Sequence, residues 1–426
     1  MDTLCISNIN KQTFYTHKSA KIESIDFIGL SKRLGSALNL GKSIKPINCD
    51  SFVEILIQYR SIIEKLQLMC RTNTLKIIML GPSLLQQGGI SGYEKLFLEY
   101  APSEVQIYHI ITHDEGAIAL KIMVFLKAIW KFLWMLIREE VDIVQIEISQ
   151  RGSVFRQAIM TLLAWVFHKP IILHAHGSQF HLFYAGLAKW IQKLLSWVFC
   201  KCQRLIVLSE SWKNFYIENL GLKPEQVVVF YNPVKVPVEV PSRSVSSKVN
   251  LLFLGRIGQR KGAFDLIKAF SFLPTEYQTR SSMIMAGDGD IEQARNLVTT
   301  LNLENYIQLP GWIGSDERDI LLTEADVFLL PSYNEGLPLA MLEAMAWELP
   351  VIVTPVGGIP EIVTQSENGL IVNPGNIKQL SDAIKSLIEN EALRLSLGAK
   401  ARTSVFPLDI KKHWVDFIDL YHSVLN

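Results

Sequence analysis

The sequence predicts an α/β protein with two doubly wound parallel sheets, and three observations support this fold class. Short apolar runs alternate with segments of helical period along the chain. A Pro- and Ser-rich stretch, residues 231–248, divides this pattern into two parts and is expected to be a linker. Gly, His and charged residues follow several apolar runs, as expected at the carboxyl ends of parallel strands, where such sheets bind ligands.

The chain has 426 residues, which is long enough for two domains, and a formal net charge of +1. This total conceals an asymmetry. Residues 1–237 carry 26 Lys and Arg against 18 Asp and Glu, whereas residues 238–426 carry 16 against 23. The two halves therefore present fields of opposite sign, and no nucleic-acid partner is expected.

The first part of the chain offers few signals. It has no apolar segment of signal-peptide type, so a cytoplasmic location is expected. Within the N-terminal extension, residues 1–72, only Ser51–Cys70 has apolar positions at helical spacing, and we expect the extension to be loosely packed or partly disordered. The cysteines lack disulfide-like spacing, which favours a reducing compartment; they are Cys5, Cys49, Cys70, Cys200 and Cys202.

The first domain is expected to begin with a strand over Lys76–Leu80 and a helix from about Tyr93. Between them lies a glycine-rich loop that contains Gly88 and Gly89. Backbone N–H groups at such a junction are free to point at a phosphate, although a tight strand–helix connection explains the loop nearly as well. The spacing is not GxGxxG, so a dinucleotide fingerprint is absent. Further strands are expected at Val105–Ile110, Val141–Ile146, Ile171–His174, Leu205–Leu208 and Val227–Phe230.

Residues 117–138 form an unusually apolar and cationic helical segment. It is long enough to cross a bilayer, but Lys121, Lys127 and Lys131 interrupt it and disfavour a membrane span. Lys127, Lys131 and Arg138 project within a narrow sector, which suits a surface helix with one buried face.

Residues 189–204 combine the same two properties. Lys193 and Arg204 belong to a basic stripe, and Trp190 and Trp197 lie opposite. An ordinary helix that packs its apolar face on the sheet explains either segment as well as an amphipathic helix on an anionic membrane does. Two such helices in the positively charged half favour peripheral membrane contact.

Three histidines lie at or after the end of the strand Ile171–His174. His174, His176 and His181 have spacing that suggests a metal cluster, but no carboxylate or cysteine is near them in the sequence. We therefore expect no metal site. His174 is expected to be packed within the strand.

The second domain is expected to open with a strand over Asn250–Leu254. Gly255 and Arg256 follow it, and Lys261 precedes the next helix. Two cations beside backbone donors suit a diphosphate, and the flanking glycines make a solvated basic loop the weaker explanation.

Two further strand ends belong to this domain. Met283–Ala286 leads into Gly287 within a Gly-Asp-Gly-Asp turn, where a strand ends and a helix starts, so no metal is invoked. The strand Ile307–Leu309 is followed by Trp312 and Ile313. A last strand is expected at about Leu370–Val372, and a final helix over Asp409–Leu425, with Trp414, Phe417, Ile418 and Tyr421 on one face.

The rest of the chain is organised around residues 331–361. A buried strand, Val327–Leu330, is followed by a polar loop, a helix through Trp347 and a second strand, Val351–Thr354. Glu335 lies in the loop and Glu343 in the helix, so both could face one pocket. An acidic residue that merely favours a helix N-terminus is the alternative for Glu335.

This stretch closely resembles the signature of the retaining glycosyltransferase family 4, the group 1 glycosyltransferases. In that signature two Glu are separated by seven residues, as Glu335 and Glu343 are, and the first is followed by a loop like Gly336-Leu337-Pro338. The resemblance implies the GT-B fold, in which two Rossmann-like domains face a central cleft. It also implies a nucleotide-diphosphate sugar as the donor, with no metal and no other cofactor.

The resemblance further implies a division of labour between the parts of the chain. Residues 73–236 would bind the acceptor and residues 237–408 the nucleotide sugar. Residues 409–426 would form a helix that crosses back to the first domain.

Roles for single residues follow from the same resemblance. Arg256 and Lys261 would bind the donor diphosphate, Glu343 the ribose hydroxyls and Glu335 the hexose hydroxyls. His176 would contact the donor sugar or the acceptor. The remaining positions expected at the donor are Gly88, Gly89, Gly287, Trp312, Ile313, Gly336, Leu337 and Pro338.

Taken with the resemblance, which implies retention and metal independence, these observations predict hexosyl transfer to a hydroxyl of a glycan or lipid-linked acceptor, on the cytoplasmic side and peripherally at the membrane. A nucleotide-sugar epimerase of the same fold would need further acid–base carboxylates that the sequence does not place. A catalytically silent scaffold is disfavoured because Arg256, Lys261, Glu335 and Glu343 are all present. A dinucleotide oxidoreductase is disfavoured by the missing fingerprint.

Overall fold

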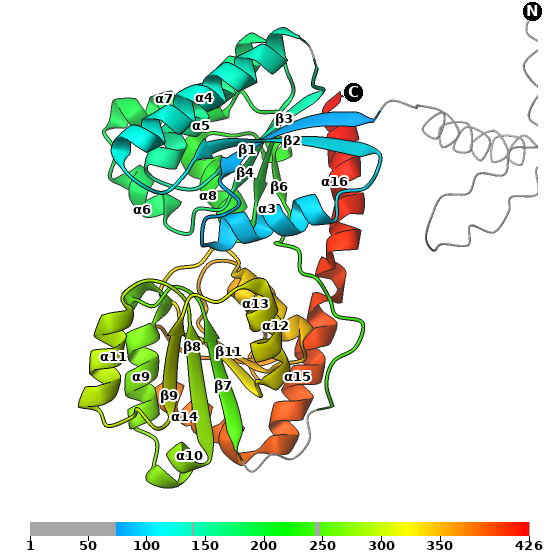
Figure 1. Ribbon diagram of the computed structural model, residues 1–426. Helices are drawn as coiled ribbons and strands as arrows, with labels where there is room; N and C mark the ends of the chain where they lie inside the picture. The colour runs from blue at the N-terminus through cyan, green and yellow to red at the C-terminus, as the bar shows by residue number, and fades with distance from the viewer. Residues whose placement is uncertain (1–73, 139, 243–247, 426) are drawn as a thin grey trace, which may run out of the picture. The chain divides into compact units, whose positions relative to one another are not determined.

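The computed structural model describes residues 74–138, 140–242 and 248–425. The expectations for residues 1–72, including the helix over Ser51–Cys70, lie outside the described residues. The described chain contains two six-stranded parallel sheets with helices between successive strands, which confirms the predicted fold class (Figure 1).

The first sheet has the strand order β2-β1-β3-β4-β5-β6. Its inner strands are buried on both faces, which is why they read as apolar runs in the sequence. All neighbours pair in parallel, so their carboxyl ends meet at one edge. The strands are β1 Leu75–Pro82, β2 Val105–His113, β3 Ile143–Ile148, β4 Ile171–Ala175, β5 Arg204–Val207 and β6 Val227–Val229.

Helices cover both faces of this sheet. Successive side chains of β1 point to opposite faces: Ile78 and Leu80 belong to one buried cluster, and Ile77 and Met79 to another. The first cluster is completed by α4 Ile118–Ile137, α5 Gly152–Val166, α6 Phe180–Ala185, α7 Lys189–Phe199 and α8 Glu210–Leu220. The second is completed by α3 Gly89–Glu99 and α16 Ile410–Leu425.

The second sheet has the order β12-β11-β10-β7-β8-β9 and one continuous buried cluster. Its strands are β7 Val249–Leu254, β8 Ser281–Ala286, β9 Ile307–Gly311, β10 Val327–Leu330, β11 Val351–Val353 and β12 Gly369–Ile371. Its helices are α9 Ala263–Ser271, α10 Thr275–Thr279, α11 Ile291–Thr300, α12 Ser315–Glu324, α13 Leu339–Ala346, α14 Ile377–Glu389 and α15 Glu391–Val405. Short 3-10 helices occur in both parts of the chain: η1 Pro224–Gln226 precedes β6 of the first sheet, and η2 Gln259–Lys261, η3 Ile359–Glu361 and η4 Phe406–Leu408 follow β7 in the sequence.

The C-terminal helix α16 follows the second domain in sequence but packs on the first sheet (Figure 1, red). Trp414 stacks on Phe97 of α3 with ring centroids 4.0 Å apart, and its Nε1 donates to the Phe97 carbonyl at 3.1 Å. The Tyr421 hydroxyl donates to Gln145 Oε1 of β3 at 2.6 Å. This helix therefore completes the core of a domain to which it is not adjacent in sequence.

Two predicted helix boundaries were wrong. Helix α3 begins at Gly89 rather than near Tyr93, because the loop glycines enter its first turn and the Gly92 N–H donates to the Gly88 carbonyl. Helix α7 ends at Phe199, so Arg204 is not on its basic stripe but opens β5.

The face that α7 buries also differs from the expectation. Leu195, Val198 and Phe199 are buried in the first cluster, whereas Trp190 and Trp197 are exposed. Periodicity identified an apolar stripe but could not decide which of two apolar sectors meets the core.

Candidate functional site

The carboxyl end of β7 forms a close-packed glycine turn. Gly255 and Gly287 both have φ near +155°, and a Cβ placed on Gly287 would lie 1.9 Å from the Gly255 carbonyl oxygen. Only glycine fits at such a contact, so the ends of β7 and β8 can approach closely. Arg256 extends from this turn into solvent, and its Nη1 lies 3.6 Å from Asp288 Oδ2. An exposed guanidinium held this loosely is available to an anion.

Lys261, which is partly buried, forms an ion pair with the buried Glu335 next to this turn. Lys261 Nζ donates to Glu335 Oε1 at 2.6 Å, and Ser332 Oγ donates to the same oxygen at 2.7 Å. Arg260 Nη1 lies 3.8 Å from the other oxygen, Oε2. Glu335 is only 6% exposed, so these partners offset the cost of burying its charge.

Glu343 has a different partner from Glu335. It lies on α13, is half-buried, and its Oε1 is 3.1 Å from Arg318 Nη1 of α12. Burial raises the pKa of Glu343, Arg318 opposes this shift and Asp319 adds to it. The sequence predicts that Glu335 and Glu343 could face one pocket. In the structure each is paired with a cation from another element, Glu335 with Lys261 and Glu343 with Arg318.

The loop after Glu335 touches the first sheet. A Cβ on Gly336 would lie 3.6 Å from the carbonyl oxygen of His176, so the Gly336 backbone lies beside the end of β4. Leu337 is buried in the core of the second domain, and its carbonyl accepts a 2.6 Å hydrogen bond from Asn232 Nδ2. Its side chain is therefore structural, and Pro338 is the N-cap of α13.

Two predicted donor residues lie in the turn after β9. Trp312 is about half exposed, whereas Ile313 packs against the core of the second domain. The indole is therefore the accessible ring surface of this pair.

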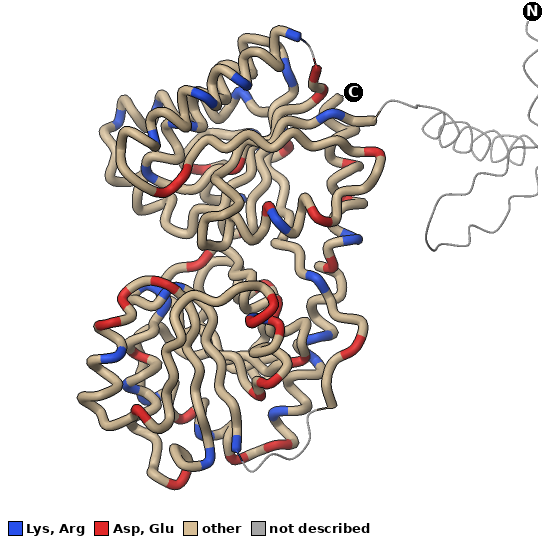
Figure 2. Tube along the Cα trace, in the orientation of Figure 1, with Lys and Arg blue, Asp and Glu red and all other residues tan. Residues whose placement is uncertain are grey.

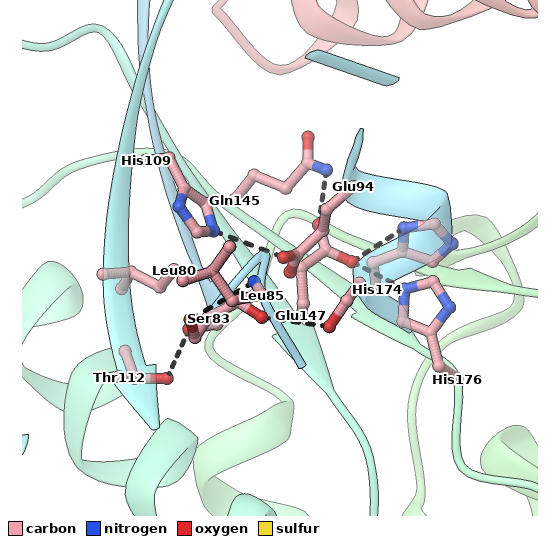
Figure 3. A network of polar contacts seen from close by, with 12 residues as sticks. Leu80, Ser83, Leu85, Glu94, His109, Thr112, Gln145, Glu147, His174 and His176 are labelled. Carbon is pink, nitrogen blue, oxygen red and sulfur yellow. Dashed lines mark hydrogen bonds and ion pairs between the residues drawn. The ribbon is translucent and has the colours of Figure 1, made fainter. Parts of the chain in front are cut away.

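His176 lies at the end of β4 and is held by a buried carboxylate (Figure 3). Its Nε2 is 2.6 Å from Glu147 Oε2. Burial opposes the ionisation of Glu147, but His174 and His176 outweigh it and hold the pKa of that carboxyl well below its usual range. Because Glu147 is a carboxylate, Nε2 carries the hydrogen of this contact, and the contact fixes the ring orientation of His176.

The carboxylate itself is held from the other side. Gln145 Nε2 donates to Glu147 Oε1 at 2.6 Å, and Gln145 in turn accepts from Tyr421 of α16. A continuous chain of hydrogen bonds therefore links the C-terminal helix to His176.

Glu147 is the site residue that sequence reasoning missed. The argument that no carboxylate joins His174 and His176 was wrong, because β3 lies beside β4 and places Glu147 opposite His174. One possible ligand atom from each of these three residues lies within 4.8 Å of the others, whereas His181 packs on Trp212 instead. The available signal was an acidic residue in a largely apolar strand, β3, which directly precedes the histidine strand β4 in the sheet order.

A second buried carboxyl lies in the same network (Figure 3). Glu94 of α3 is fully buried, and its Oε2 is 3.3 Å from His109 Nε2, although the two make no well-aligned hydrogen bond. Burial, reinforced by the charge on Glu147 and opposed by His176, raises the pKa of Glu94 to about 9. Glu94 is therefore a neutral acid at pH 7.

Gly88 and Gly89 are open to a ligand. A Cβ on either residue would meet no atom within 4 Å. Both line a pocket of about 360 Å³ at the carboxyl edge of the first sheet.

The outer face of α4, α5 and α7 is apolar and cationic. None of these three helices contains Asp or Glu, and Figure 2 shows Lys along α4. Lys201 lies over the rings of Trp165 and Trp197 at 4.7 and 4.5 Å. Exposed apolar residues on this outer face are Ile118, Leu120, Ile122, Met123, Leu126, Trp130, Trp134, Ile137, Phe155, Ile159, Trp165, Val166, Trp190, Leu194 and Trp197.

Trp190 and Trp197, which would be buried if this apolar side of α7 packed on the sheet, are exposed on this surface. Among the described residues, no helix combines the length and apolarity needed to cross a membrane.

Solved structures share this architecture. The Anabaena protein HepE in complex with UDP-glucose superposes with a TM-score of 0.67 at 18% identity, covering 82% of this chain and 100% of that one. Sucrose-phosphate synthase from Thermosynechococcus elongatus gives 0.65 at 18% identity, covering 82% and 99%. The fold is the two-domain Rossmann-like GT-B fold of glycosyltransferases.

Family models and sequence relatives agree with the fold. The model "Glycosyl transferases group 1" matches residues 240–404, and "Glycosyltransferase Family 4" matches residues 96–236. An uncharacterized glycosyltransferase of Methanocaldococcus jannaschii is 24% identical over 70% of this chain and 79% of its own length. The UDP-Gal:alpha-D-GlcNAc-diphosphoundecaprenol alpha-1,3-galactosyltransferase of Escherichia coli is 27% identical over 76% and 85%. The chain belongs to the group 1, family 4 glycosyltransferases and is a sugar-transferring enzyme.

Proposed function

We propose that this enzyme transfers a hexose, with retention and without a metal, from a nucleotide-diphosphate sugar to a hydroxyl of a lipid-linked or polysaccharide acceptor on the cytoplasmic side of a membrane. The observation that carries the proposal is the Lys261–Glu335 ion pair beside the glycine turn of Arg256. Support for the donor class comes from the solved relative in complex with UDP-glucose, and for the acceptor class from the relative named for a diphosphoundecaprenol substrate.

The reaction requires positive charge and hydrogen-bond donors beside the leaving group. Breaking a sugar–phosphate bond builds negative charge on the departing diphosphate, and fixed donors aimed at that charge lower the barrier most. Arg256, Lys261 and the backbone near Gly88 and Gly89 supply such donors. Glu335 holds Lys261 in place and is itself an acceptor for hexose hydroxyls.

The other predicted residues orient the substrates. Glu343, with a raised pKa, accepts from the ribose hydroxyls, and Trp312 offers its exposed ring to the base. His176, held by Glu147, faces the donor sugar or the acceptor. Same-face attack, in which the donor phosphate receives the acceptor proton, explains retention without a protein nucleophile.

A nucleotide-sugar panel tests this proposal. The wild type, Arg256→Ala and the control Arg280→Ala, an exposed arginine on the far side of the same domain, are compared by thermal shift and by slow donor hydrolysis. One donor is expected to stabilise the wild type and Arg280→Ala by several degrees and to lose at least about tenfold in affinity with Arg256→Ala. No response of folded wild type to any donor would instead favour a silent scaffold.

The outer face of α4, α5 and α7 supports a membrane location. Trp130 and Trp190 are 73% and 69% exposed, and cations but no acidic side chains accompany them on these helices. Amphipathic surfaces of this kind bind at the interface of anionic membranes through aromatic burial and basic charge. The occupant that fits is therefore an anionic lipid surface.

Vesicle sedimentation of the full chain tests this surface. Binding to vesicles with about 30 mol% phosphatidylglycerol is expected to exceed binding to pure phosphatidylcholine and to weaken with salt. The double variant Trp130→Ser, Trp190→Ser should lose at least about tenfold in binding, whereas Phe272→Ser, an equally exposed residue of the second domain, should not. Lipid-independent dimerisation that only the double variant abolishes would show that a second copy covers this face.

A further inference from the structure

The pocket lined by Gly88 and Gly89 is also lined by polar side chains that carry unpaired buried atoms. It is formed by the loop after β1, the ends of β2 and β3 and the first turns of α5. The side chains of Gln86, His113 and Arg156 line it, and each has a buried nitrogen without a hydrogen-bond partner among the described residues: Gln86 Nε2, His113 Nδ1 and Arg156 Nε. Leaving such groups unpaired is energetically unfavourable. Three such side chains around one cavity suit a ligand rich in acceptor oxygens.

The charge of this pocket is also unbalanced. Arg156 forms no ion pair with a described residue. The one acidic residue in the wall is Glu147, which is already engaged by His176 and Gln145. Burial lowers the pKa of Arg156, and burial together with Arg156 and Lys121 lowers the pKa of His113. An anion would relieve both penalties.

The wall offers acceptors as well as donors. Gln157 is almost fully buried; its Nε2 donates to Thr112 Oγ1 at 3.1 Å, while its Oε1 has no partner among the described residues. An unpaired carbonyl beside unpaired donors suits a ligand that carries hydroxyl groups next to its anionic group, such as a sugar phosphate.

We propose that this pocket binds the phosphate of the acceptor, in the class of sugar phosphates and lipid-linked sugar diphosphates, and that Arg156 is its principal contact. This inference rests on the proposed function, in which Arg256, Lys261 and the backbone near Gly88 and Gly89 hold the donor diphosphate, and it assigns the remaining wall of the pocket, around Arg156, to the acceptor. Helix α5 carries Arg156 in the pocket wall and Phe155 and Trp165 on the exposed apolar face. One helix thus connects an anion site to the proposed membrane surface, as a lipid-linked phosphate requires.

Calorimetric titration of the full chain tests the inference. The probes are hexose 1-phosphate and farnesyl diphosphate, measured in an Arg256→Ala background that disables the donor site. Arg156→Gln is compared with Arg151→Gln, which makes the same charge change at an exposed position outside the pocket wall. We expect Arg156→Gln to weaken probe binding about 10- to 100-fold, Arg156→Lys to restore part of it, and Arg151→Gln to bind like the background.

The outcomes separate the sources of the phosphate and the two proposals. Tighter binding of farnesyl diphosphate supports a lipid-linked acceptor, and tighter binding of hexose 1-phosphate supports a soluble one. Equal binding by Arg156→Gln and Arg151→Gln, or no binding of either probe, overturns the inference. So does a loss of nucleotide-sugar binding in Arg156→Gln with Arg256 intact, because the pocket would then belong to the donor. Failure of the wild type to bind any nucleotide sugar refutes the proposed function instead.

Discussion

Glu94→Gln should make the protein more stable, and by an amount that grows with pH. Glu94 is fully buried, and its raised pKa of about 9 means that the native state keeps a proton that the unfolded chain releases near pH 4.5. Between these values unfolding releases a proton, so the free energy of unfolding falls as pH rises, by about 1.4 kcal/mol per unit. Over three pH units this loss is about 4 kcal/mol.

Glutamine keeps the shape of the side chain and removes its titration. The Glu94 side chain packs directly against Gly81, where a Cβ would lie 1.8 Å from Glu94 Oε1, so a side chain of the same shape is needed to keep this contact. His109 cannot supply a compensating charge, since burial, reinforced by Lys131 and opposed by Glu147, lowers its pKa. The advantage of the variant should therefore be small at about pH 5 and on the order of 4 kcal/mol at about pH 8.

Thermal unfolding at several pH values measures this difference. At about 2 °C per kcal/mol for a chain of this size, the gap in Tm between the variant and the wild type should widen by several degrees from about pH 5 to about pH 8. Glu99→Gln, the same change at an exposed position of α3, should show no such widening. Parallel curves for wild type and Glu94→Gln would refute the assignment of Glu94 as a buried neutral acid.

Three further perturbations test the site and the domain core. Lys261→Met should cost about 3–5 kcal/mol in chemical denaturation, because it leaves Glu335 buried without its 2.6 Å partner; an unchanged midpoint would contradict the pairing. Gly357→Ala should displace the Glu335 loop and abolish donor binding, because Gly357 has φ +60° and its Cβ would lie 2.1 Å from the Glu335 carbonyl; titration of the donor found in the panel checks this. Trp414→Ala should lower the free energy of unfolding by about 3–5 kcal/mol, because it removes the ring that stacks on Phe97. A loss below about 1 kcal/mol would show that α16 docks on the first sheet without the help of Trp414.

Much of the fold could be predicted because its strands and turns depend on patterns within a few consecutive residues. Val327–Leu330 was predicted at the bounds that the structure gives, and the other expected strands agree within a few residues. Strands buried on both faces are apolar along most of their length, so they can be predicted from their own sequence without knowledge of the neighbouring strands. The two cations of the second domain, Arg256 and Lys261, could also be predicted, because the turn that positions them is contiguous in sequence.

The prediction failed where partners come from distant segments. Glu147 meets His176 because β3 and β4 are neighbours in the sheet. Tyr421 reaches Gln145 only because the chain returns to the first domain after completing the second. No periodicity in either segment encodes these contacts.

The sequence by itself determined the alternation of strands and helices, the two parallel sheets and the glycine, cation and carboxylate turns at their carboxyl ends. These features depend on burial periodicity and local backbone geometry, which act over a few residues. Only the tertiary structure decided which face of α7 is buried, which carboxylate holds His176 and where unpaired donors surround a pocket. Burial and pairing are properties of the space around a side chain, and segments far apart in the sequence supply that space.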